Sequence, residues 1–145
     1  MRHARPLTSF IPFLAFLVAS APLSADEVAV VSAKSTVTTL NKTQMADIFL
    51  GKTTRFPNGA PAVPIDQSEG TAARDEFYVQ IAGKSAAQMK AYWSRIIFTG
   101  RGQPPRAASN SSETKKLIAA NPNTIGYIER PLVDDTVRVV TVTPQ

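Results

Sequence analysis

The residues best suited to chemistry lie in one stretch, from Pro64 to Tyr78, where an apolar segment leads through a polar turn into a helical pattern. Residues 62–65 are apolar, residues 66–70 are polar and end in a glycine, and apolar side chains recur at helical spacing from Thr71 onward. A strand that enters a helix through such a turn aims backbone N–H groups and the positive end of the helix dipole at one point, which favours an anion. The alternative is an ordinary strand–helix turn with a Ser/Thr cap.

The first 25 residues have the layout of a secretory signal peptide rather than of the domain that holds this turn. Arg2, His3 and Arg5 form a positive start, residues 10–18 are apolar, and small residues lead to a predicted cleavage after Ala25. An uncleaved anchor is the alternative, but the apolar run is short for a bilayer span. We therefore expect one exported, periplasmic domain, residues 26–145, which meets the membrane only through its signal peptide.

Loss of the leader removes several kinds of chemistry. It takes away the single histidine and two arginines, which lowers the formal net charge from +5 to +3, and the chain has no cysteine. Zinc sites built on imidazole or thiolate are thereby excluded, as are Ser-His-Asp and Cys-His mechanisms. The acidic pairs at residues 75–76 and 134–135 are sequence neighbours, and neighbours point apart on a helix. We predict a binding protein, not an enzyme, with no cofactor or metal.

Helical and extended patterns alternate over most of the remaining chain, which predicts an α/β domain with helices packed on a mixed sheet. Helix starts are marked by Asn41 with Gln44, by Thr71, by Ser85 with Gln88, and by Ser111 or Ser112. The first three of these helices are expected to be stopped by Gly51, Gly83 and Gly100, and the fourth to run through Ala120. Extended segments are predicted at residues 27–32, 36–40, 62–65, 125–128 and 133–142, the last as one strand from Val137 to Val142.

Three further features have open readings. Met89, Tyr92, Trp93, Ile96 and Ile97 form a stripe at helical spacing, and we assign this stripe, like Phe77, to the core rather than to a ligand site. The basic segment 101–106, with its two prolines, is either a solvated connector or a rim contact with an anion or partner. A glycine at position 126, inside a strand pattern, indicates that another part of the chain or a ligand comes close.

Four segments together resemble a known family, the periplasmic phosphate-binding proteins of ABC transporters, within the type II periplasmic-binding-protein superfamily. The segments are residues 46–52 (Ala-Asp-Ile-Phe-Leu-Gly-Lys), the turn 69–71 with Phe77, residues 91–100, and residues 123–127 (Asn-Thr-Ile-Gly-Tyr). The chain looks most like the small, single-lobe relatives labelled phosphate ABC transporter substrate-binding proteins. The resemblance implies the α/β fold of one type II lobe, with helices packed on a mixed sheet.

The resemblance also implies where a ligand would sit. In full-length members the turn reads Ser-Gly-Thr and holds the oxyanion at the helix N-terminus; here Gly70 and Thr71 match, and Glu69 replaces the serine. A carboxylate there opposes an anion unless it turns away or is paired, and Arg74 is the expected partner. Ile65 and Asp66 stand where the family usually carries an arginine. The candidate ligand residues are Ser68, Glu69, Gly70, Thr71, Arg74, Gly126 and Tyr127.

Two functions remain open. The first is an exported solute-binding protein that binds phosphate or another small anion in connection with ABC-type transport, with an ABC permease, a second lobe or a second protomer as partner. The second is a ligand-free interaction module of the cell envelope, derived from a solute-binding lobe, which docks on an envelope protein through its exposed cleft face and the segment 101–106. The chain lacks the basic blocks of a nucleic-acid-binding protein, so no nucleic acid is expected as partner.

Overall fold

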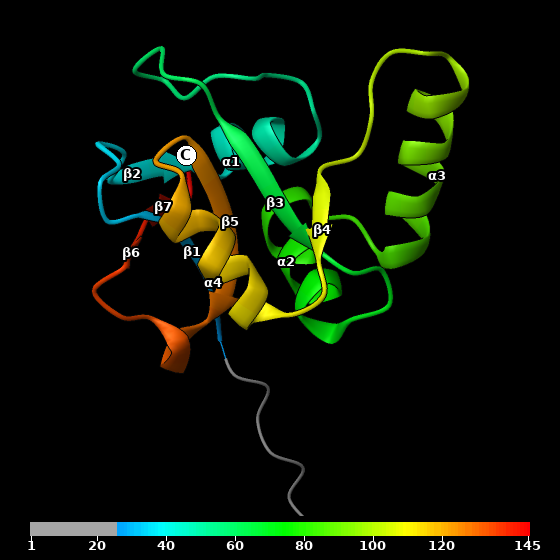
Figure 1. The fold of residues 1–145 in the computed structure, drawn as a ribbon. Coiled ribbons are helices and arrows are strands. Elements are labelled where there is room, and N and C mark those ends of the chain that lie inside the picture. The colour runs from blue at the N-terminus through cyan, green and yellow to red at the C-terminus, as the bar shows by residue number, and fades with distance from the viewer. Residues whose placement is uncertain (1–25) are drawn as a thin grey trace, which may run out of the picture.

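The computed structural model describes residues 26–145, so the predicted signal peptide, residues 1–25, lies outside the described residues. A five-stranded mixed sheet of order β4-β3-β5-β1-β6 forms the centre of the fold (Figure 1). Strand β1 runs antiparallel to β5 and β6, whereas β3 runs parallel to β4 and β5. The predicted α/β architecture with a mixed sheet is confirmed. The strands are β1 (Glu27–Ser32), β2 (Thr39–Asn41), β3 (Val63–Gln67), β4 (Arg106–Ala108), β5 (Thr124–Glu129), β6 (Val137–Val139) and β7 (Thr141–Thr143).

The helices begin at the capping residues that their sequences indicate, with one exception. Asn41 and Ser85 each form a reciprocal capping box with the glutamine three residues later, and Thr71 caps the helix that follows the polar turn. The helix predicted to start at Ser111 or Ser112 is instead capped by Asn110, whose side chain accepts from the N–H of Glu113. The helices are α1 (Lys42–Phe49), α2 (Ala72–Ala82), α3 (Ala86–Phe98), α4 (Ser111–Ala120) and the short 3-10 helix η1 (Arg130–Leu132).

Alternating side chains of the central strands build two separate cores. In β1, Val28 and Val30 pack on the side of α4, while Ala29 and Val31 pack on the side of α1 and α2. Strand β5 continues the pattern, with Ile128 on the α4 side and with Ile125 and Tyr127 in the opposite core. Because both faces are covered, the central strands read as continuous apolar runs rather than as alternating ones.

The predicted C-terminal strand is wrong in one respect, because it is two strands in two sheets. Residues 137–139 pair with β1, but the N–H of Thr141 donates to the carbonyl of Thr38, and β7 then pairs with β2 in a separate two-stranded parallel sheet. Between β6 and β7, where the chain passes from one sheet to the other, the N–H of Val140 donates to the carbonyl of Ala29.

Helix α3 stands apart from the sheet, beyond the edge strand β4, and a long connection returns the chain from its end to that strand (Figure 1). The hydroxyl of Tyr92 donates to the carbonyl of Leu50 at 2.6 Å, which fastens α3 to the end of α1. Trp93 is buried, as predicted, but Ile97 is 54% exposed, so its assignment to the core is wrong; the next residue, Phe98, is 92% exposed. None of the helices within residues 26–145 combines the length and the apolar character needed to cross a membrane.

Candidate functional site

The turn between β3 and α2 is closed by hydrogen bonds within itself and to β4. The N–H and hydroxyl of Ser68 both donate to the carbonyl of Ala108, at 3.0 and 3.3 Å, and the N–H and hydroxyl of Thr71 both donate to the carbonyl of Ser68. Gly70 is exposed and has φ +88°, a left-handed conformation that favours glycine. The two hydroxyls that the sequence offers to an anion therefore already have carbonyl acceptors.

The first turn of α2 nevertheless presents backbone donors. The backbone N–H groups of Gly70, Ala72 and Ala73 donate to no hydrogen-bond acceptor among the described residues. Unpaired N–H groups at a helix N-terminus, together with the helix dipole, attract an anion. Two carboxylates oppose that attraction, since Glu69 lies in the turn and Asp75 lies in the first turn of the helix.

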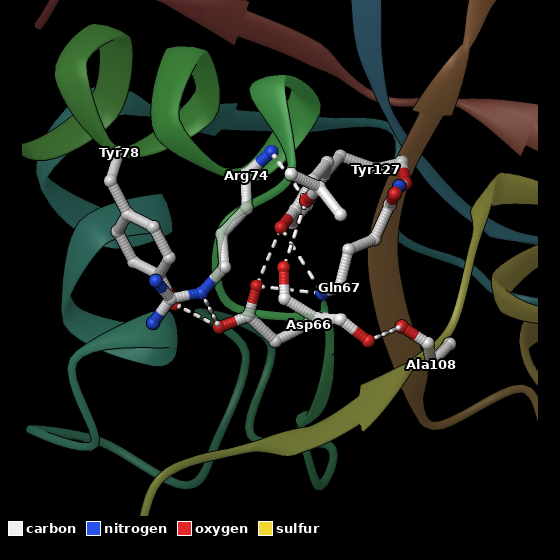
Figure 2. Close-up of polar contacts among 8 residues, drawn as sticks. Asp66, Gln67, Arg74, Tyr78, Ala108 and Tyr127 are labelled. Atoms are coloured by element: carbon white, nitrogen blue, oxygen red, sulfur yellow. Dashed lines mark hydrogen bonds and ion pairs between the residues drawn. The ribbon is translucent and has the colours of Figure 1, made fainter. Parts of the chain in front are cut away.

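A buried carboxylate, Asp66, is the polar centre beneath this turn (Figure 2). It accepts from the hydroxyl of Tyr127 at 2.5 Å, from the hydroxyl of Tyr78 at 2.7 Å and from Nε of Arg74 at 3.3 Å. The N–H of Gln67 also donates to it, at 2.8 Å. The partners come from β3, α2 and β5, so this cluster joins the strand before the turn to the helix after it.

The cluster also fixes the charge states of its members. Burial, reinforced by the neighbouring charge of Asp66, raises the pKa of Tyr78 and of Tyr127 far above the usual 10. Burial acts to lower the pKa of Arg74, but the charge and hydrogen bond of Asp66, together with the neighbouring Tyr78 and Tyr127, outweigh it and raise that pKa overall. The arginine therefore stays charged, with 8% of its surface exposed, and both tyrosines stay neutral and donate to the carboxylate.

A cavity of about 340 Å³ opens beside the turn, between α2, α3 and β4. Its charged lining consists of two cations, Arg74 and Lys90, and two carboxylates, Asp66 and Glu69. Trp93 forms part of its wall. We call this space the turn cavity; because its charges balance, an anion gains little from long-range attraction and depends on hydrogen bonds inside the cavity.

The structure brings together some of the residues predicted for the site and separates others. Glu69 and Arg74 line the turn cavity, with Ser68, Gly70 and Thr71 in the adjoining turn. The expected pairing of Arg74 with Glu69 is wrong, because Arg74 pairs with Asp66, and Glu69 is exposed.

Gly126 and Tyr127 are buried in β5 and do not line the turn cavity. A Cβ on Gly126 would lie 2.6 Å from Cδ1 of Ile118 and 2.9 Å from Cγ2 of Thr114, so the close approach is that of helix α4. Tyr127 stacks on Phe77 with ring centroids 3.9 Å apart, and its hydroxyl meets the end of β3, where it donates to Asp66 and accepts from the N–H of Gln67. Its part is to hold the residues beneath the turn in position.

Sequence reasoning missed three members of the site, namely Asp66, Tyr78 and Lys90. Asp66 was assigned to the polar turn, but β3 runs two residues further than its apolar pattern, and alternation then points the carboxylate into the aromatic core. The spacing of Arg74 and Tyr78 was an available signal, since residues four apart share a helix face; the guanidinium lies 5.1 Å from the Tyr78 ring centroid. Within residues 26–145, no group of three or more His, Cys, Asp or Glu side chains is placed to hold a metal ion.

No protein-family model matches the chain, and no curated protein matches it. Solved structures do match. One, described as a phosphate ABC transporter substrate-binding protein with bound phosphate from Clostridium perfringens, has a TM-score of 0.67 and 25% identity over 83% of this chain and 46% of its own.

Two further solved structures are more distant in sequence but similar in fold. An ABC-type phosphate transport receptor from Vibrio cholerae has a TM-score of 0.64 and 17% identity, over 81% of this chain and 46% of its own. PstS from Borrelia burgdorferi has a TM-score of 0.62 and 12% identity, over 82% of this chain and 47% of its own. The chain thus spans less than half the length of the structures that it matches.

Proposed function

Since the described residues share the fold of about half of a phosphate ABC transporter substrate-binding protein, we propose that the chain is an exported solute-binding protein for a small anion, with phosphate as the first candidate. The similarity to such proteins supports a solute-binding role. The observation that carries the proposal is the match, over 83% of this chain, to a structure with bound phosphate. The neighbours are substrate-binding proteins of transport systems, which supports a binding rather than a catalytic role.

The proposed site is the turn at residues 68–71 with the adjoining turn cavity. The unpaired N–H groups at the start of α2 would receive the anion's oxygens, and Lys90, which is exposed and lines the cavity, would supply positive charge. Arg74 is engaged by Asp66 and contributes less than a free arginine would. We infer weak binding by the single chain, because the cavity's charges balance.

A second lobe, a second protomer or an ABC permease would then complete the cleft. In this proposal the chain works in the periplasm after removal of its signal peptide, since the neighbours are substrate-binding proteins of ABC-type transport and residues 1–25 have the composition of a leader.

Thermal unfolding with and without phosphate tests the anion site. A ligand at about ten times its Kd raises the free energy of unfolding by about 1.4 kcal/mol, several degrees in Tm for a domain of this size. We expect that shift at about 10 mM phosphate, against chloride at matched ionic strength, if Kd is about 1 mM. Lys90→Gln should reduce the shift, and Lys34→Gln, at an exposed residue outside the cavity, should not. Equal curves in phosphate and chloride would reject phosphate as the ligand.

A ligand-free interaction module is the second candidate, and one feature favours it. Phe98 is 92% exposed at the end of α3, three residues before Arg101 in the sequence, and the hydroxyls of the turn already donate to backbone carbonyls. An exposed aromatic next to a cation is typical of a docking surface. Replacement of Phe98 by serine, or of Arg101 together with Arg106 by alanine, is expected to lower recovery of an envelope partner in a pull-down. Unchanged recovery of every partner in both variants would exclude this surface.

A further inference from the structure

A second cavity, which shares Trp93 in its lining with the turn cavity, has a different character. It lies between the end of α1, helix α3 and the segment that leads into β4, and it has a volume of about 530 Å³. We call it the basic groove. Its charged lining consists of Lys52, Arg101 and Arg106, with no acidic residue among the described residues that form it.

The wall and floor of the basic groove are apolar and aromatic. Tyr92, Trp93 and Ile96 line it from α3, and Ala62, Val63 and Pro64 line it from β3 and the residue before it. The volume falls within the range of small-molecule sites, which are mostly apolar with a few polar groups that orient the ligand. An apolar wall under a cationic rim matches a molecule with an apolar body and an anionic head.

The groove is also held in shape without a ligand. The hydroxyl of Tyr92 donates to the carbonyl of Leu50, so its ring is fixed against the groove. Gly51, at φ +72°, lies against the indole, and a Cβ there would be 3.3 Å from Cη2 of Trp93. A preformed wall lowers the ordering cost of binding.

The cations of the groove are not neutralised to the same degree. Lys52 and Arg101 are exposed and form no ion pair with a described residue. Hydrogen bonds from Ser109 lower the pKa of the Glu113 carboxyl, and the charge of Arg106 adds to this effect, so part of the Arg106 charge is already compensated. Lys52 and Arg101 are therefore the two side chains with charge left to receive an anionic group.

We propose that the basic groove is a binding site, separate from the turn cavity, for a small amphiphilic organic anion: a molecule with an aromatic or aliphatic body and a terminal phosphate or carboxylate. The body packs on Tyr92, Trp93 and Ile96, and the head meets Lys52 and Arg101. Inorganic phosphate lacks the body and a neutral aromatic lacks the head, so each forms only part of these contacts. This site stands on its own lining and does not depend on phosphate binding at the turn.

The chain contains one tryptophan, Trp93, which lines the groove and so reports binding through its fluorescence. Phenyl phosphate is the probe, with inorganic phosphate and phenol as its two halves. We expect phenyl phosphate to bind at least about tenfold tighter than either half, because loss of one charged or packed contact set costs that much or more. Equal affinities for phenyl phosphate and inorganic phosphate would overturn the proposal. So would unchanged Trp93 fluorescence at phenyl phosphate concentrations about ten times higher than those that saturate a site with a millimolar Kd.

Variants locate the bound probe, since Trp93 also borders the turn cavity. The double variant Lys52→Gln with Arg101→Gln should lower the affinity for phenyl phosphate at least about tenfold. Both residues are exposed, so we expect the variant to fold as the wild type does, and circular dichroism checks this. Lys90→Gln, in the turn cavity, and Phe98→Ser, at the end of α3, should leave the affinity within about twofold. Loss of affinity in Lys90→Gln with none in the groove variant would place the probe in the turn cavity and refute the groove.

Discussion

Asp66→Asn tests whether the buried cluster beneath the turn holds strand and helix together. The native carboxylate has donors on both oxygens, and its negative charge compensates Arg74, which is 8% exposed. Asparagine keeps the volume of the side chain but removes its charge. Its NH2 group is itself a donor and would face the groups that donate to the native carboxylate. Removing one partner of a buried ion pair costs about 3–5 kcal/mol. That is a large fraction of the roughly 5–15 kcal/mol that stabilises a typical domain.

Urea unfolding followed by circular dichroism measures this loss. Asp135→Asn, at an exposed carboxylate in a loop, is the matched control and should stay within about 0.5 kcal/mol of wild type. Arg74→Met completes a double-mutant cycle. Its cost should fall by at least about 1 kcal/mol when Asp66 is already asparagine, because the arginine then has no charge partner to lose. An Asp66→Asn cost below about 1 kcal/mol, or two costs that simply add, would refute the claim that the pair is a structural unit.

Three other properties follow from the same contacts. Gly126→Ala should destabilise the protein by about 1–3 kcal/mol in urea, because the new Cβ meets Ile118 at 2.6 Å, and wild-type stability would contradict that crowding. Burial raises the pKa of Tyr78 and Tyr127, so the folded state holds these protons more tightly; stability should fall as the pH rises above 10, with tyrosinate absorbance increasing only as helicity is lost. Burial and nearby carboxylates raise the pKa of Glu27 from 4.5 to about 7. The free energy of unfolding should therefore fall as the pH rises from 4.5 to about 7, by about 1 kcal/mol after allowance for solvent screening. Glu27→Gln should remove this dependence of stability on pH.

The sequence was informative wherever the signal is local. Capping boxes at Asn41 and Ser85 and the left-handed glycine at position 83 set the helix ends that the pattern predicts. Strands β1 and β5, buried on both faces, read as apolar runs, and that pattern predicted them. These signals depend on residues within about four positions of each other, so no tertiary contact is needed to interpret them.

The errors occur where a partner distant in sequence decides the outcome. Strand β4 exists because residues 106–108 pair with β3. The sequence of this short segment, which follows two prolines, contains no local signal for that pairing. Asp66 looked like a turn residue because polarity usually marks turns, whereas its side-chain donors lie 8, 12 and 61 positions away. Gly126 was correctly read as a point of close approach, but only the packing of α4 identifies the neighbour.

The two cavities beside Trp93 differ in how their cations are used, and this difference governs what each can bind. In the turn cavity the arginine is committed to Asp66, so an anion there would rely on backbone N–H groups and Lys90, both open to solvent and to salt screening. In the basic groove, Lys52 and Arg101 have no ion-pair partner among the described residues. In the proposed turn site, a small inorganic anion would gain from a second protein surface that excludes water, whereas an amphiphilic anion in the proposed groove site would gain that exclusion from its own apolar body. Binding at the turn should accordingly strengthen when a second lobe or protomer is added, and binding in the groove should not.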